Sequence, residues 1–402
     1  MSRKSRRKNV KKLVCLFIVL IFVGFSAYLY FNFIKENETV AVFNSDEEIA
    51  LDEAYTTVTN EDEIKENAIK LSSDLKNDID KTVATAENVG VTFIKDNDIY
   101  YNELGEILVV MYHGLTDGVV SDDKYHRSIA GFKDDLITLY NNNYRLISLD
   151  EYLNNSFDLS AGMTPVLLTF DDGLSSAFSL EKTEGVLVPK KNCAVDILEE
   201  FYKIHNDFGK SAVFFINNKY EPFAGEGSIE ERFNFLIENG YSIGNHSYSH
   251  ADISTLSEEN IIKEIGLNHN IVSDYGYNMY SFAYPYGAVP TSMDIKDVFN
   301  NEYDDKSYSY SLGFLAFLLD DFSSNPLSVN YHNYMIPRFR GTNNELLDLG
   351  YFLEYYDENP EHRYFSDGNT QVVTIPFEKY SELDVTSSLV TNKDILVVGE
   401  GY

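Results

Sequence analysis

The sequence predicts an α/β fold in which short parallel strands alternate with helices, and three observations support this prediction. From Glu106 onward, short apolar runs are separated by longer amphipathic segments, which is typical of β/α units rather than of an all-β domain. The 402 residues are 44% hydrophobic, enough for a large core. Only Cys193 lies outside the apolar run that contains Cys15, so packing rather than a disulfide must hold that core.

The predicted strands and helices follow one another along the chain. We expect strands at 107–113, 145–149, 165–170, 211–216, 241–245 and 280–284. Apolar residues three and four positions apart predict helices in three of the connecting segments, and Ser257 is the expected cap of the last one. The helical positions are Phe132, Leu136 and Leu139; Ala194, Ile197, Leu198 and Phe201; Ile261, Ile262 and Ile265.

The N-terminus has the pattern of a membrane anchor. Residues 1–12 hold seven basic side chains and no acidic one, and residues 13–34 form an apolar run. About 20 apolar residues suffice to cross a hydrocarbon core of about 30 Å, and the basic end stays cytoplasmic. We expect a single-pass protein with its catalytic domain outside the cell. A cleaved signal peptide is the alternative, although its apolar part is usually shorter.

Residues 35–104 are predicted to be an acidic stalk, because Asp, Glu, Asn and Thr dominate and helical periodicity is patchy. The whole chain has 64 Asp and Glu against 32 Lys and Arg, and seven of the basic residues belong to the tail. So acidic a surface argues against nucleic acid as a partner and is compatible with neutral or cationic glycans.

The first chemical motif is TFDDG, which follows the strand at 165–170 and contains Asp171 and Asp172. Catalytic groups in parallel β/α folds gather at the carboxyl ends of strands. Taken alone, Asp-Asp-Gly is more often an ordinary turn after a strand.

The second motif is NHSYSH, in which His246 and His250 are four residues apart. One helical turn would bring both imidazoles onto one face. Two histidines and a carboxylate, with water in the remaining position, form an open catalytic metal site, for which Zn²⁺ is the usual ion in hydrolysis. Surface histidines are the alternative, but the acidic pair on a neighbouring strand favours one divalent metal.

The third motif is YSFAYPYG, in which Pro285 and Gly287 predict a sharp turn around Tyr286. Such a turn can direct the backbone N–H of Tyr286 into a site, although ordinary Pro-Gly turns are common.

Together these motifs resemble the signature of the polysaccharide deacetylase family, also called the NodB-homology domain, over residues 105–345. The resemblance implies a distorted or incomplete (β/α) barrel of seven strands. It also implies that Asp171 is the general base, that Asp172, His246 and His250 hold the metal, and that Pro285 and Tyr286 contact substrate, with the Tyr286 N–H stabilising the oxyanion.

The general acid departs from the usual family pattern. Many members supply it from a late Leu-x-His motif, which is absent here, and the contexts of His332 and His362 are unlike the end of a buried strand. His113 ends the strand at 107–113, so we assign it as the acid. A chain in which the strand that carries the acid comes first resembles the circularly permuted branch of the family, which includes exopolysaccharide deacetylases acting on poly-N-acetylglucosamine. A capped strand end is the alternative.

Two further departures concern an arginine and a tryptophan. Many members carry an arginine that orients the base at the position of Ala283, and we assign Arg338 in its place because a guanidinium fork suits a carboxylate. A surface role for Arg338 is an equal alternative. The chain has no Trp, so Tyr or Phe must line the acetyl pocket, with 312–319 contributing.

The function predicted from these features is the hydrolysis of N-acetyl groups on N-acetylglucosamine-containing polysaccharide, releasing acetate. Two alternatives use the same scaffold: an O-acetyl xylan esterase, and an inactive glycan-binding relic. Peptidoglycan, poly-N-acetylglucosamine and chitin are not separated by the sequence. Residues 346–402 are predicted to be a small C-terminal addition with one strand near 371–375 and an apolar run at 394–398.

Overall fold

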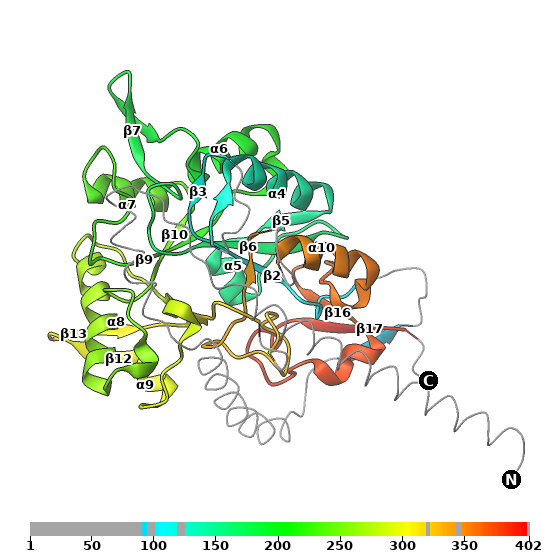
Figure 1. Cartoon of the computed structure of the whole chain (residues 1–402). Helices are drawn as coiled ribbons and strands as arrows, with labels where there is room; N and C mark the ends of the chain where they lie inside the picture. Colours follow the sequence, from blue (N-terminus) through cyan, green and yellow to red (C-terminus); the bar gives the residue numbers. More distant parts are fainter. Residues whose placement is uncertain (1–90, 95–100, 119–124, 319–321, 343–347, 400–402) are drawn as a thin grey trace, which may run out of the picture. The chain divides into compact units, whose positions relative to one another are not determined.

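The structure is a computed structural model that describes residues 91–94, 101–118, 125–318, 322–342 and 348–399 (Figure 1). Its main sheet has a path of seven strands, and every pairing along that path is parallel. A further strand, β5, pairs with β6 alone. In spatial order the path is β14 (Leu312–Phe314), β11 (Ser281–Ala283), β10 (Ser242–Asn245), β9 (Val213–Ile216), β6 (Thr164–Phe170), β2 (Leu108–Tyr112) and β15 (Phe339–Arg340), and β5 is Tyr144–Leu146.

The two ends of this path approach each other through the segment that precedes β15. Phe314 of β14 forms a parallel bridge with Ile336. The N–H of Leu315 donates to the Ile336 carbonyl at 2.8 Å, and the N–H of Ile336 donates to the Gly313 carbonyl at 2.8 Å. Because Phe339 pairs with β2, a few residues connect one end of the sheet to the other. The sheet therefore curves as in a (β/α) barrel, as the sequence predicted.

Alternation along the strands divides the apolar side chains into two clusters. Residues such as Val109, Leu167, Val213 and Phe215 pack together inside the curved sheet. Their neighbours in sequence face outward and pack against the helices in a larger cluster. This period of two is what parallel strands covered on both sides require. It also decides which residues at the strand ends face the interior.

Helices cover the outer face of the sheet. Three of them, α4, α6 and α8, occupy the segments predicted from periodicity, and α8 begins after Ser257 as expected. The short α5 and α7 were not predicted, although both have a serine–glutamate capping box. The helices are α4 (Ile129–Asn141), α5 (Leu149–Asn154), α6 (Ala194–Ile204), α7 (Ile229–Glu238), α8 (Glu258–Ser273), α9 (Ile295–Phe299) and α10 (Leu349–Glu358).

Short hairpins and 3₁₀ turns complete this part of the chain. The long connection after the TFDDG motif contains a hairpin that projects from the molecule in Figure 1, formed by β7 (Leu180–Thr183) and β8 (Val186–Pro189). The others are β3 (Leu115–Thr116) with β4 (Arg127–Ser128), β12 (Asn300–Tyr303) with β13 (Lys306–Ser309), and the turns η2 (Asn206–Phe208), η3 (Ile253–Thr255), η4 (Pro285–Gly287), η5 (Pro360–His362) and η6 (Phe377–Glu382).

A second, smaller sheet corrects the predicted limits of the stalk and of the C-terminal addition. Its order is β1 (Val91–Ile94), β17 (Asp394–Val398) and β16 (Val372–Pro376), all parallel. β16 lies where a strand was predicted and β17 lies on the apolar run noted at 394–398, but β1 comes from the segment assigned to the stalk, 35–104. Helix α10, assigned to the addition at 346–402, packs in the main core through Leu349 and Leu353. Pairing between segments far apart in the sequence leaves little local signal, so the predicted limits were wrong there.

The predicted anchor, residues 13–34, and the basic tail, residues 1–12, lie outside the described residues. Among the residues that are described, no helix is both long and apolar enough to cross a membrane.

Candidate active site

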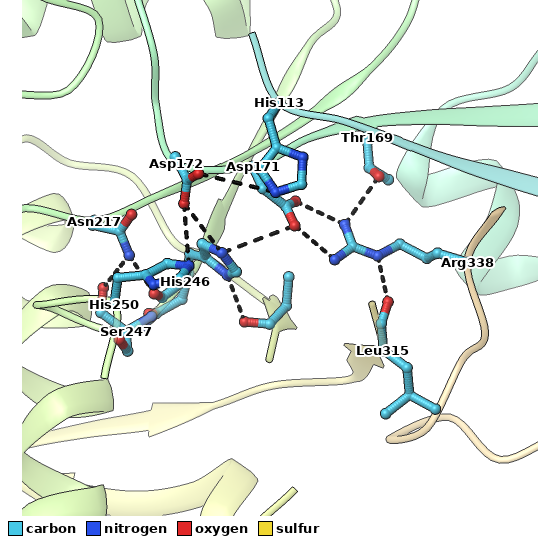
Figure 2. Close-up of polar contacts among 12 residues, drawn as sticks. His113, Thr169, Asp171, Asp172, Asn217, His246, Ser247, His250, Leu315 and Arg338 are labelled. Carbon is cyan, nitrogen blue, oxygen red and sulfur yellow. Dashed lines mark hydrogen bonds and ion pairs between the residues drawn. The ribbon is translucent and has the colours of Figure 1, made fainter. Parts of the chain in front are cut away.

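Polar side chains gather where four neighbouring strands of the main sheet end. His113 follows β2, Asp171 follows β6, Asn217 follows β9 and His246 follows β10. Each continues the inward-facing alternation of its strand, and each is less than 8% exposed. Since parallel strands end at the same edge, these four side chains converge on one site, which we call the basin (Figure 2).

Asp172, His246 and His250 form a compact cluster of possible metal ligands. One ligand atom from each lies within 4.8 Å of the others. The Oδ1 atom of Asp172 is 3.4 Å from Nε2 of His246 and 3.3 Å from Nε2 of His250. All three side chains are buried. An oxygen and two nitrogens in this arrangement are a donor set for a divalent transition metal.

The protonation of the two histidines follows from their surroundings. Nδ1 of His246 lies 2.8 Å from the Ala283 carbonyl, so it donates the ring proton there and Nε2 faces the cluster. Burial lowers the pKa of His250 to about 4, which keeps that ring neutral. Burial also acts to lower the pKa of His246, but the carboxylates of Asp171 and Asp172 outweigh it and raise the pKa.

Asp171 is held by the arginine that the sequence proposed for it. Nη1 and Nη2 of Arg338 donate to Oδ1 and Oδ2 of Asp171, both at 2.7 Å. The rest of the guanidinium donates to the Thr169 hydroxyl at 3.1 Å and to the Leu315 carbonyl at 2.6 Å (Figure 2). Burial acts to raise the pKa of Asp171, but Arg338 and His246 outweigh it, so the pKa lies below its ordinary value. The surface alternative for Arg338 is wrong, because its side chain is buried.

His113 lies beside the acidic pair (Figure 2). Its Nε2 is 4.0 Å from Oδ2 of Asp172. Burial lowers the pKa of His113 despite the nearby carboxylates. The ring of Tyr125 packs edge-on against it, with ring centroids 5.1 Å apart. The sequence therefore identified a histidine that reaches the basin, while its role as the acid stays a prediction.

The Pro-Tyr-Gly turn forms another wall of the basin. Pro285 opens the 3₁₀ turn η4, and Tyr286 has a positive φ of 60°. The Tyr286 ring packs edge-on against His250, with centroids 4.5 Å apart. Gly287 has φ +72°, and a Cβ there would come within 2.3 Å of the Phe317 ring. This contact brings Phe317, from the segment proposed to line the acetyl pocket, against the turn.

These motifs are also what a family comparison detects. Residues 160–301 match the model of the polysaccharide deacetylase family. This part of the chain is a polysaccharide deacetylase domain. The match contains the acidic pair, both clustered histidines and Tyr286, but neither His113 nor Arg338. This part of the chain is therefore similar to hydrolytic deacetylases.

Several solved structures are similar to the chain at low sequence identity. The deacetylase PplD of Streptococcus pyogenes, solved with acetate, is 16% identical, with a TM-score of 0.46 over 62% of this chain and 97% of that one. IcaB of Ammonifex degensii is 16% identical, with a TM-score of 0.40 over 64% and 99%. The putative polysaccharide deacetylase BA0330 of Bacillus anthracis is 18% identical, with a TM-score of 0.44 over 62% and 68%. No curated protein matches the chain.

The polysaccharide deacetylase domain differs from the sequence prediction in how it brings its histidines together. We expected one helical turn between His246 and His250. The structure has an irregular turn instead, with left-handed φ at Ser247 and His250. Hydrogen bonds from neighbouring elements hold this turn, and spacing alone does not reveal them.

Two residues of the basin were not predicted from the sequence. Asn217 continues the alternation of Val213 and Phe215 and so faces inward at the end of β9. The period of two along this strand is visible in the sequence and could have predicted that position. Tyr125 belongs to a loop far from any recognised motif, so only the tertiary structure brings it to His113.

Proposed function

We propose that this chain is a metal-dependent polysaccharide N-deacetylase that hydrolyses the acetamide groups of N-acetylglucosamine-containing polysaccharide and releases acetate. One observation carries the proposal. Asp171, held by Arg338, lies beside the three possible ligands, with its Oδ2 atom 3.8 Å from Nε2 of His246. A buried carboxylate with fixed orientation next to a metal-ligand cluster is the arrangement that metal-assisted hydrolysis needs.

The residues present fit a divalent cation, and Zn²⁺ is the ion we propose. Asp172 is ionised, because the surrounding histidines hold its pKa far below the ordinary value although burial acts to raise it. His250 is neutral, and the His246 ring is oriented by its bond to Ala283. Three such protein ligands leave further positions open. When bound, the ion supplies Lewis acidity that polarises a carbonyl and acidifies water.

Asp171 is the proposed general base. It accepts a proton from the water that attacks the acetamide carbonyl carbon. The Arg338 fork keeps the carboxylate ionised and fixes both oxygens, although a lowered pKa also makes it a weaker base. The same fork excludes rotation of the carboxylate, so the free oxygen lone pairs stay directed at the basin.

His113 is the proposed general acid. Cleavage of the C–N bond releases an amine, whose nitrogen needs a proton, and His113, beside the acidic pair, delivers it. Burial lowers the pKa of His113, so its protonated form is the minor one and gives up its proton readily. The proton that Asp171 takes from water balances the one that His113 gives to the amine. We further propose that the N–H of Tyr286 stabilises the negative oxygen and that Pro285 shapes the turn which carries it.

Acetate release tests the proposal directly. We would load the full chain with Zn²⁺ and offer N-acetylglucosamine oligomers beside acetylated xylan. Asp171→Asn should abolish release, whereas Asp207→Asn, a change in an exposed carboxylate paired with Arg145 outside the basin, should not. Release from xylan alone would contradict N-deacetylation and indicate the esterase. Binding of oligomers and metal without any release would indicate the relic.

The location of the protein is also a proposal. The basic tail and apolar run of residues 1–34 support an anchor that leaves the deacetylase domain on the outer side of a membrane. That location gives the domain access to a polymer outside the cell.

A further inference from the structure

The turn that carries both histidine ligands has a backbone conformation that its own residues do not favour. Ser247 and His250 have φ values of 59° and 56°. Non-glycine residues rarely adopt the left-handed region, and they persist there only where surrounding structure determines it. The position of the His246 and His250 rings therefore depends on groups outside the turn.

Helix α8 and the end of β10 hold much of this turn. Asn245 accepts the N–H of Ser247 at 2.8 Å. The Glu264 carbonyl accepts the N–H of Tyr248 at 2.9 Å, and the Glu264 carboxylate accepts both the N–H of Ser249 at 2.8 Å and its hydroxyl at 2.9 Å. These contacts fix N–H groups of the turn. They do not involve its first two carbonyls, those of His246 and Ser247.

Asn217 binds those two carbonyls. Its Nδ2 donates to the His246 carbonyl and, at 3.2 Å, to the Ser247 carbonyl (Figure 2). Successive carbonyls of an extended chain point in opposite directions, and the left-handed Ser247 lets both face one amide group. The Asn217 side chain is 7% exposed, so water does not compete for these bonds.

The backbone on both sides of Asn217 is itself fixed. Nδ2 of Asn268, on α8, donates to the Ile216 carbonyl at 2.8 Å, and its Oδ1 accepts the N–H of Asn218 at 3.0 Å. Asn268 also donates to Oδ1 of Asn245 at 2.8 Å. A continuous amide network thus connects β9, α8 and β10 beneath the metal-ligand turn. Neutral amides can do this without adding a charge beside the ligands.

We propose that Asn217 is a positioning residue for the metal site, which holds the His246 and His250 rings in place by binding the carbonyls of His246 and Ser247. This inference rests on the metal site of the proposed function. Removal of a group that orients a metal ligand through hydrogen bonds usually weakens metal binding by about 10- to 100-fold. A primary amide is required, because a carboxylate has no donor and an apolar side chain leaves both carbonyls unbound.

The test measures Co²⁺ binding to the full chain, by titration and by the visible absorption of the bound ion. Asn217→Leu should weaken Co²⁺ binding about 10- to 100-fold and change the absorption spectrum. The matched control is Asn270→Leu on α8. Asn270 is also 7% exposed and donates Nδ2 to one carbonyl, that of Tyr303, away from the metal-ligand turn. Asn270→Leu should leave both Co²⁺ affinity and spectrum unchanged.

Two further variants make every outcome decisive. Asn217→Ala replaces Asn217→Leu if the larger apolar side chain prevents folding, and the same loss of affinity is expected. His246→Ala should abolish Co²⁺ binding, and failure to do so would overturn the proposed metal site itself. If His246→Ala abolishes binding but both Asn217 variants bind Co²⁺ like the unmodified chain, the positioning role is overturned while the metal site stands.

Discussion

Removing Arg338 should destabilise the deacetylase domain through the charge that it leaves behind. In Arg338→Met the side chain keeps much of its volume but loses the four hydrogen bonds to Asp171, Thr169 and Leu315. Asp171 then remains as a buried carboxylate without its cation. Breaking a buried ion pair on one side typically costs about 3–5 kcal/mol of unfolding free energy. We expect a loss of that size at neutral pH.

The cause can be isolated with a double-mutant cycle. Asn at position 171 carries no charge and does not need a cation, so Arg338→Met should cost at least about 2 kcal/mol less in an Asp171→Asn background. Urea unfolding of the four proteins, with metal removed by a chelator, gives these free energies. Costs that add within about 0.5 kcal/mol would refute the reasoning, because they would show no coupling between the two side chains.

The pH dependence of the same variant has a definite sign. Arg338 lowers the pKa of Asp171, so the folded protein gains stability from this carboxylate above the unfolded pKa and loses it as the pH falls. Without Arg338, burial raises the pKa of Asp171, so the carboxyl becomes protonated at a higher pH. The destabilisation by Arg338→Met should therefore shrink as the pH is lowered toward 4. A penalty that grows on acidification would contradict this account.

Three further predictions concern the acid, the second sheet and the anchor. His113→Ala should lower turnover without changing metal content, whereas His246→Ala should lose the metal, as measured by acetate release and elemental analysis; undiminished turnover would exclude His113 as the acid. Burial raises the pKa of Glu103 to about 7, so the folded state holds a proton that the unfolded state releases above about pH 4.5. Stability should fall by about 3 kcal/mol between pH 4.5 and 7 through this group, and Glu103→Gln should remove that fall in urea unfolding. Deletion of residues 1–34 should release the chain from membranes on fractionation, and unchanged partition would refute the anchor.

The parallel order of the sheet was predictable because its strands are short, apolar and buried on both faces. Six of the strands in the main sheet lie where apolar runs predicted them, and so does β16 of the second sheet. The two strands that were missed, β14 and β15, are three and two residues long and are the two ends of the path. β5 and β11 are also only three residues long, but the apolar runs around them predicted them. For β14 and β15, pairing with β11 and β2 decides that they are strands.

For the site, the sequence by itself determined which chemical groups are present and in what order they follow their strands. Asp171, Asp172 and His113 end apolar runs, and parallel strands place such ends at one edge. Only the tertiary structure decided how those groups are held. The Arg338 fork spans a sequence separation of 167 residues, and the turn of His246 and His250 takes its left-handed shape from Asn217, Asn245 and Glu264. Local sequence sets strands and their alternation, whereas orientation depends on hydrogen bonds between segments that meet only in the fold.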